Sequence, residues 1–296
     1  MSMFSLLGAL EIGLIFSLVA LGVLISFRLL RFPDLTVDGS FPLGGAVAAT
    51  LISFGHDPFL ATVAATGAGA VAGLLTGWLN VRLRIMDLLA SILMMIALYS
   101  INLRIMGKPN VPLIMEPTVF SILQPSFLSD YVARPLMLLV VVIVAKVLLD
   151  WFLSTQTGLA LRSTGANPRM SRAQGVNTGR MILGGMALSN ALVALAGALF
   201  AQTQGGADIS MGIGTIVIGL AAVIVGESLL PSRRLVMMTL AVILGAIVYR
   251  FFIALALNSD FIGLQAQDLN LVTAVLVTLA LVLPNVKRRI FKGRGR

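Results

Sequence analysis

The chain has 296 residues, of which 58% are hydrophobic and 11% are charged, whereas soluble domains carry about 25% charged residues. This much apolar surface exceeds what one water-soluble core hides, and a mean hydropathy of +1.01 indicates that the solvent is a lipid bilayer. The absence of cysteine excludes disulfides and thiolate metal sites, and the net charge of +9 does not indicate nucleic acid binding, because the basic residues lie at the ends of apolar runs.

Apolar runs of about 20 residues predict membrane-spanning helices. Eight such runs follow one another: Leu6–Phe27, Pro58–Asn80, Asp87–Ile105, Pro135–Leu153, Met181–Thr203, Gly212–Leu230, Leu235–Leu257 and Asp268–Pro284. A ninth run, Gly39–Phe54, is shorter and opens with glycine, serine and a nearby proline. We expect it to be a broken or partly re-entrant second span, covered by protein or water. The sequence therefore predicts an all-α polytopic bundle of eight or nine transmembrane helices, forming one domain over residues 1–296.

The basic residues predict the orientation of the bundle, because cytoplasmic loops carry an excess of Lys and Arg. With nine crossings and the C-terminal tail inside, the inside loops hold 16 Lys and Arg residues and the outside loops hold 2. We therefore expect the N-terminus outside and the C-terminus in the cytoplasm. The outer loop, residues 107–134, contains four prolines and is interpreted as a surface cap or docking segment.

Small and charged residues within the runs predict helix contacts. Gly69, Gly73 and Gly77 are spaced by four, so they share one helix face and favour close packing against another helix. Lys146 and Asp150 are also four residues apart, and we expect them to pair and to extend toward the membrane surface.

Uncharged polar side chains inside the runs indicate which residues face inward. Such groups usually face the interior of a bundle or a water-filled cavity. Ser40, Asn102 and Asn190 lie within predicted spans, and Asn190 is the deepest. If the chain is a transporter, as the resemblance given below implies, we expect these three residues to line its translocation path.

The most informative soluble feature is the basic loop at residues 155–180. Gly158–Thr164 fits two helical turns, which a left-handed Gly165 would end. Asn167 and Pro168 fit the N-cap and the first position of a second short helix. We expect a rigid helix–turn–helix segment, named the elbow here, on the cytoplasmic face. The alternative is a solvated loop that merely follows the charge rule.

Motifs for chemistry are missing from the sequence. There is no G-x-x-x-x-G-K-[ST], HExxH or Gly-x-Ser-x-Gly motif and no Cys/His cluster. The lone histidine, His56, precedes Asp57 and Pro58 and is interpreted as a turn residue. We expect no enzymatic activity, no metal site and no cofactor bound by this chain itself.

Four stretches of the sequence resemble the permease subunits of ATP-binding-cassette (ABC) importers, in the group related to branched-chain amino acid and ribose permeases. Within that group they are most similar to tryptophan/tyrosine-type permeases. The stretches are 31–45, which enters the irregular second span; 98–110; 157–168 with 173–176, similar to the family's cytoplasmic coupling segment; and 218–227.

The resemblance implies a permease homodimer in the bacterial cytoplasmic (inner) membrane, working by alternating access. A separate cytoplasmic ATPase would bind ATP and Mg²⁺, and an extracytoplasmic binding protein would deliver a small solute, an amino acid and more narrowly an aromatic one. It also implies ATPase coupling by residues of the elbow: Gly158, Leu161, Arg162, Gly165, Asn167, Pro168, Arg169 and Arg172.

Other classes of protein stay open from the residues alone. An ion-coupled secondary transporter would need buried ionisable residues to bind H⁺ or Na⁺, and the predicted spans hold few of them. A channel, a lipid flippase and a non-transport membrane scaffold are the remaining alternatives.

Overall fold

The computed structural model describes residues 3–123, 130–232 and 234–257, together with residues 275 and 278. Within this part of the chain, seven helices are long and apolar enough to cross a membrane, and they coincide with seven of the predicted runs. They are α1 (Met3–Val23), α3 (Pro58–Leu83), α4 (Asp87–Met106), α6 (Asp130–Ser154), α9 (Thr178–Gln204), α10 (Thr215–Leu229), which follows the 3-10 turn η2 (Ile209–Gly212), and α11 (Leu235–Leu257). The predicted run Asp268–Pro284 lies almost entirely outside the described residues.

The second predicted span is helix α2 (Val37–Ser53), which has 17 residues and is continuous through Pro42. The irregular backbone comes before it. A π-helix, η1 (Leu24–Leu29), continues α1, and Arg31 then adopts a φ of 57°, which is uncommon for a residue other than glycine. We call residues 24–36 the irregular connection. Most of α2 is buried, as expected for a short span that must be covered by protein.

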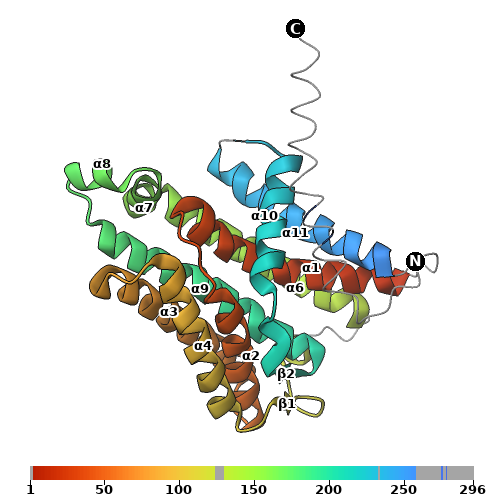
Figure 1. Ribbon diagram of the computed structural model, residues 1–296. Helices are drawn as coiled ribbons and strands as arrows, with labels where there is room; N and C mark the ends of the chain where they lie inside the picture. The colour runs from red at the N-terminus through yellow and green to blue at the C-terminus, as the bar shows by residue number, and fades with distance from the viewer. Residues whose placement is uncertain (1–2, 124–129, 233, 258–274, 276–277, 279–296) are drawn as a thin grey trace.

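Helix α9 separates two groups of helices (Figure 1). On one side α2, α3 and α4 pack against one another, and α2 and α3 also pack along α9. On the other side α1 packs against α6, α10 and α11, and it also contacts α9. α9 therefore contacts both groups, and α2 also contacts α10 directly.

The contact between α3 and α9 depends on the predicted glycine face. A Cβ added to Gly69 would lie 2.5 Å from Asn190 O, and one added to Gly73 would lie 2.7 Å from the carbonyl carbon of Met186. At Gly77 the nearest atom of α9 is 3.3 Å away. The prediction of close helix packing is confirmed, because only glycine lets the two backbones approach this far.

Three aromatic rings join α1, α2 and α9. The ring centroids of Phe16 and Phe41 are 5.7 Å apart, and those of Phe41 and Phe200 are 5.5 Å apart. Phe16 and Phe41 are buried, and Phe200 is partly buried. The two helices that flank the irregular connection are thus packed on the same part of α9.

Short elements lie at the two ends of the bundle (Figure 1). At one end are α7 (Gln156–Ala166) and α8 (Pro168–Ala173); at the other are β1 (Asn110–Pro112), β2 (Gly206–Asp208) and α5 (Val119–Leu123). The two strands are antiparallel, with Asn110 opposite Asp208. This pairing ties the outer loop to the connection between α9 and η2.

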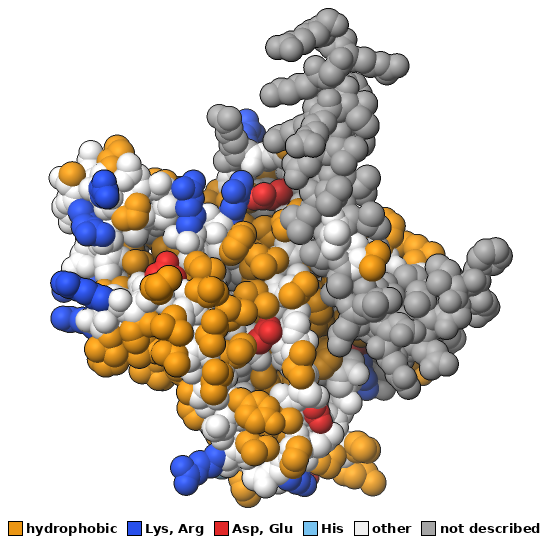
Figure 2. Space-filling view, viewed as in Figure 1, with side chains coloured by type: hydrophobic (Ala, Val, Ile, Leu, Met, Phe, Trp, Pro, Cys, Tyr) orange, Lys and Arg blue, Asp and Glu red, His pale blue; other side chains and the backbone are white. Residues whose placement is uncertain are grey.

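The surface has the pattern of a protein that spans a bilayer. Figure 2 shows hydrophobic side chains across the middle of the face, while Lys and Arg gather near α7 and α8 and at the opposite end. Large apolar residues such as Val63 and Trp151, both 69% exposed, would be unfavourable in water. The chain is therefore a multi-pass integral membrane protein.

Candidate functional site

The elbow contains α7, α8 and the start of α9, and local capping sets its shape. The Asn167 side-chain oxygen accepts hydrogen bonds from the backbone N–H groups of Arg169 and Met170, both at 3.1 Å, and Pro168 occupies the first helical position. Gly175 follows α8 with a φ of 81°. The prediction of a second, capped short helix is confirmed.

The prediction that Gly165 ends the first short helix in a left-handed conformation is wrong. α7 continues to Ala166, and Asn167 ends it with extended backbone at φ −154°. The residue before a proline is restricted to such backbone, so Pro168 rather than a glycine stops the helix. Gly165 instead permits a close approach: an added Cβ would overlap Leu29 O and lie 2.7 Å from Leu30 Cα.

The inner face of the elbow is anchored in the protein. A Cβ added to Gly158 would lie 2.7 Å from the carbonyl carbon of Leu153, so α7 turns sharply onto the end of α6. Leu161 is 2% exposed. Its side chain and that of Leu30 both lie against Gly185 of α9, where an added Cβ would be 3.0 Å and 2.5 Å from them.

The tip of the elbow is free in the described structure. Residues 166–170 are exposed, as is Arg172. Arg162 is half-buried, and its Nε has no hydrogen-bond partner among the described residues. The elbow thus has an anchored face that contains Gly158, Leu161 and Gly165, and an exposed basic tip that contains Arg169.

The irregular connection leads from this anchored face to a buried polar network. Asp34, which is 2% exposed, accepts hydrogen bonds from Thr36 N at 3.0 Å and from Asn190 Nδ2 at 2.8 Å. Asn190 Oδ1 accepts a 2.7 Å bond from Ser40 Oγ, and its Nδ2 also donates to Met186 O. The network therefore fixes the irregular connection and α2 to α9.

The three residues predicted to line a path are completely buried, and they make different contacts. Ser40 and Asn190 are bonded to each other. Asn102 on α4 donates to Gly39 O, next to Ser40, at 3.1 Å and lines a cavity. Sequence reasoning missed Asp34, although an acidic residue between apolar neighbours was a usable signal.

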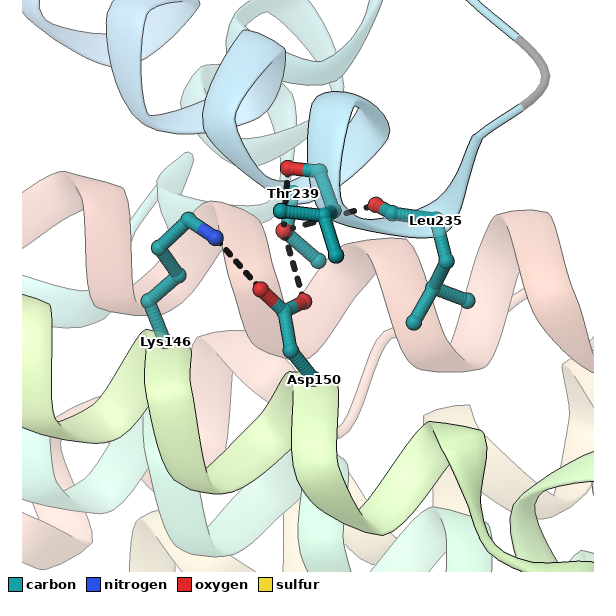
Figure 3. Close-up of polar contacts among 5 residues, drawn as sticks. Lys146, Asp150, Leu235 and Thr239 are labelled. Carbon is teal, nitrogen blue, oxygen red and sulfur yellow. Dashed lines mark hydrogen bonds and ion pairs between the residues drawn. The ribbon is translucent and has the colours of Figure 1, made fainter.

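Lys146, Asp150 and Thr239 connect α6 to α11 (Figure 3). Lys146 Nζ is paired with Asp150 Oδ2, and Asp150 Oδ1 accepts a 2.7 Å hydrogen bond from Thr239 Oγ1. The predicted pairing is confirmed. The expected extension toward the membrane surface is wrong, because the two side chains are only 14% and 12% exposed and Asp150 binds Thr239 on α11.

The outer loop is held to the bundle but presents apolar side chains. Val119 N donates to Gln202 Oε1 at 3.0 Å, which fastens α5 to the end of α9. Ile114 and Met115 are 82% and 94% exposed. Residues 124–129 lie outside the described part of the loop. Among the described residues of the chain, no group of His, Asp and Glu is placed to hold a metal ion.

Comparisons with known proteins agree with this architecture. The family described as the branched-chain amino acid transport system permease component matches residues 5–283. The tyrosine transport system permease protein of Clostridioides difficile strain R20291 is 38% identical over 284 residues, covering 96% of this chain and 92% of that protein. The galactofuranose transporter permease protein YtfT of Escherichia coli K12 is 26% identical over 88% of this chain and 74% of its own length.

A further relative, the ribose import permease protein RbsC of Escherichia coli K12, is 26% identical over 86% of this chain and 78% of its own length. No solved structure matches the chain. The family and these relatives are transport permeases, so the ion-coupled carrier, the channel and the scaffold are set aside, and the chain is not itself an enzyme. The chain belongs to the permease family of branched-chain amino acid transport systems and is the membrane-spanning permease subunit of an ABC importer.

Proposed function

We propose that this permease imports an amino acid, and more narrowly an aromatic one. The support is a difference in sequence identity. The relative named for tyrosine transport is 38% identical to this chain, whereas the relatives named for ribose and galactofuranose are 26% identical. The test is uptake into proteoliposomes that contain the permease, its ATPase and its binding protein. Unlabelled tyrosine should compete with labelled tyrosine and ribose should not. Uptake of labelled ribose without uptake of labelled tyrosine would move the assignment to sugars.

The assembly that we propose is a permease homodimer in the bacterial cytoplasmic membrane, with its N-termini outside. The partner ATPase would bind ATP and Mg²⁺ on the cytoplasmic side, and the binding protein would dock outside. The charge distribution supports this orientation. Because the chain has no cysteine, single variants Lys108→Cys and Arg169→Cys can be labelled in intact cells with an impermeant reagent. Only Lys108→Cys should react, and the reverse result would invert the topology.

One observation carries the proposed mechanism, namely the backbone contact between Gly165 of the elbow and Leu29 of the irregular connection. Closure of the ATPase pair on ATP would displace the exposed tip of the elbow. Through Gly165 the displacement would reach the irregular connection, and from Asp34 it would reach α2 and α9. Alternating access then follows as a shift of packed helices between two arrangements.

Within this mechanism Asn102 is proposed to face the path, since it lines a cavity. Ser40 and Asn190 are proposed to act behind the wall of the path. Their mutual hydrogen bond holds α2 against α9, so they would set the position of α2 rather than touch the solute. A test is Asn190→Ala, which should change the rate of uptake more than the apparent affinity for the solute.

The coupling role of the exposed tip can be tested without disturbing the core. Arg169→Glu with Arg172→Glu should weaken contact with the ATPase and lower uptake by about tenfold or more, because a contact made by a charged group contributes about 1.5–3 kcal/mol. Arg82→Glu is the matched control, since Arg82 is also exposed and belongs to another predicted cytoplasmic loop. Equal uptake by the double variant and the control would remove the tip from the coupling interface.

We also propose that the outer loop docks the binding protein. The exposed Ile114 and Met115 lie on a loop that is fixed by strand pairing and by the bond from Val119 to Gln202. A rigid loop with apolar side chains suits recognition of a partner. Met115→Glu should raise the binding-protein concentration needed for half-maximal uptake, while binding of the amino acid to the binding protein stays unchanged.

A further inference from the structure

A cavity of about 580 Å³ lies between α2, α4 and the segment that begins with η2. Its volume falls within the range of small-molecule sites. Much of its wall is apolar, with Pro42 from α2, Met95 and Ile96 from α4, and Ile209 and Ile213 from the η2 segment. Three parts of the chain that are distant in sequence therefore form one space of suitable size for an amino acid.

Asp38 is the charged residue among those that line this cavity. Its two carboxylate oxygens accept hydrogen bonds from Ile216 N at 2.7 Å and from Gly214 N at 3.3 Å. These bonds hold the carboxylate at the start of α10. Each oxygen of a carboxylate has acceptor capacity for more than one donor, so each can accept a further hydrogen bond. These two bonds by themselves are accounted for by capping of α10.

Asn102 is a second polar residue of the same cavity. Its side chain is completely buried, and its Nδ2 donates to Gly39 O at 3.1 Å, which fixes the orientation of the amide. The other end of the amide, Oδ1, accepts no hydrogen bond from the described residues. A buried amide oxygen without a donor is unfavourable. Asn102 lines the same cavity as Asp38, and a ligand that reached this oxygen from the cavity would supply the donor.

We infer that this cavity is a substrate station that recognises the protonated amino group of an amino acid with an apolar or aromatic side chain, with Asp38 and Asn102 as the acceptors. The two acceptors favour a ligand that brings donors, and the carboxylate favours a cation, while the hydroxyls of Tyr99 and Ser100 in the same lining can donate or accept. The apolar wall fits the side chain. No Lys or Arg is among the residues that line the cavity, so the carboxylate of the amino acid finds no ion-pair partner there. The inference rests on the proposed function and adds which end of the substrate is held.

The test uses a reporter residue that lines the cavity and is neither of the two proposed acceptors. Ser100 lines the cavity and is exposed, and the chain contains no cysteine, so Ser100→Cys gives a single reactive thiol. Ser53→Cys, at an exposed serine outside the lining set, is the matched control. The assembled permease–ATPase complex in nanodiscs is treated with a cationic or an anionic methanethiosulfonate reagent. The ratio of the two rates, normalised to the control, reports the charge of the cavity.

We expect Ser100→Cys to favour the cationic reagent by roughly tenfold, as a nearby carboxylate at protein dielectric implies. Adding Asp38→Asn should bring the ratio close to that of the control. Phenethylamine and L-phenylalanine should both slow the reaction of the thiol. Phenethylamine should protect at least as strongly as L-phenylalanine, because it carries the amine without the carboxylate. 3-Phenylpropionate, which lacks the amine, should not protect the thiol.

An unchanged charge ratio at Ser100→Cys, or equal protection by 3-phenylpropionate, would overturn the inference. The charge ratio of Ser100→Cys is measured with Asp38 intact, so this test remains valid even when Asp38→Asn does not fold. Uptake of amino acids by the same complex in proteoliposomes separates failure of the substrate station from failure of the proposed function. Uptake without charge preference in the cavity rejects the station and keeps the proposed function, whereas no amino acid uptake at all rejects the proposed function.

Discussion

Gly165 lies directly on the backbone of Leu29, so closely that a Cβ at position 165 would overlap the Leu29 carbonyl oxygen. No flexible side chain separates the elbow from the irregular connection at this point. A movement of α7 therefore meets the main chain of the connection directly. The same connection carries Asp34, which is bonded to Asn190 in the middle of α9.

Gly165→Ala should separate the elbow from the irregular connection. Overpacking at a tight contact costs about 1–3 kcal/mol of unfolding free energy, and here the displaced atoms are backbone. We expect lower thermal stability and less solute imported per ATP hydrolysed, measured together in proteoliposomes. Gly184→Ala is the control, because a Cβ at Gly184 meets no atom within 4 Å. An unchanged ratio of solute to ATP would show that this contact does not couple.

Gly73→Ala and Gly67→Ala form a matched pair on α3. A Cβ at Gly73 would overlap Met186 O of α9, whereas a Cβ at Gly67 meets nothing within 4 Å. We expect Gly73→Ala to lower the unfolding free energy by about 1–3 kcal/mol through overpacking. Gly67→Ala should be neutral or stabilising by up to about 1 kcal/mol through helix propensity. Thermal unfolding in detergent measures both, and equal melting temperatures would contradict the packing argument.

Asp34→Ala and Asn190→Ala should each lower the unfolding free energy by about 1–3 kcal/mol, since each leaves a buried polar partner without a hydrogen bond. Because the two residues bond to each other, the double variant should cost less than the sum of the singles by about 0.5–3 kcal/mol. Denaturation of the unchanged protein, the two single variants and the double variant gives the four free energies of this double-mutant cycle. Strict additivity would mean that the bond contributes nothing to stability.

Asp150→Ala should be strongly destabilising, because it leaves Lys146 as a nearly buried charge and removes the partner of Thr239. Breaking such a pair from one side costs about 3–5 kcal/mol. Lys146→Met combined with Asp150→Leu removes both charges and should recover most of this loss. Melting temperatures of the single and double variants decide the point; a double variant as unstable as Asp150→Ala would show that charge burial is not the cause.

Much of the architecture was predictable because the responsible signals are local in the chain. The predicted runs coincide with seven membrane-length helices, since hydropathy over about 20 residues is sufficient to identify them. The cap at Asn167 is equally local, because its partners lie two and three residues away. The end of α7 was misassigned to Gly165, since a glycine in a short helix is compatible with either a left-handed end or a close contact.

The candidate site depended on contacts that periodicity does not encode. Asn190 and Ser40 were predicted to line a path, and the sequence could not show that they bind each other across 150 positions. Lys146 and Asp150 were paired correctly by their spacing, while the role of Thr239 on α11 depended on how α6 and α11 pack. The unfilled acceptor on Asn102 is visible only when every neighbour is in place.

By itself, the sequence determined a polytopic helical membrane protein with a capped basic elbow, because hydropathy and capping act between residues that are close in the chain. Only the tertiary structure decided what the elbow rests on and where the polar residues lie. Asp34 and Asn190 are 156 residues apart. Gly165 and Leu29 likewise meet only after α1, α7 and α9 have packed. Such contacts arise from packing among helices, and no local pattern specifies them.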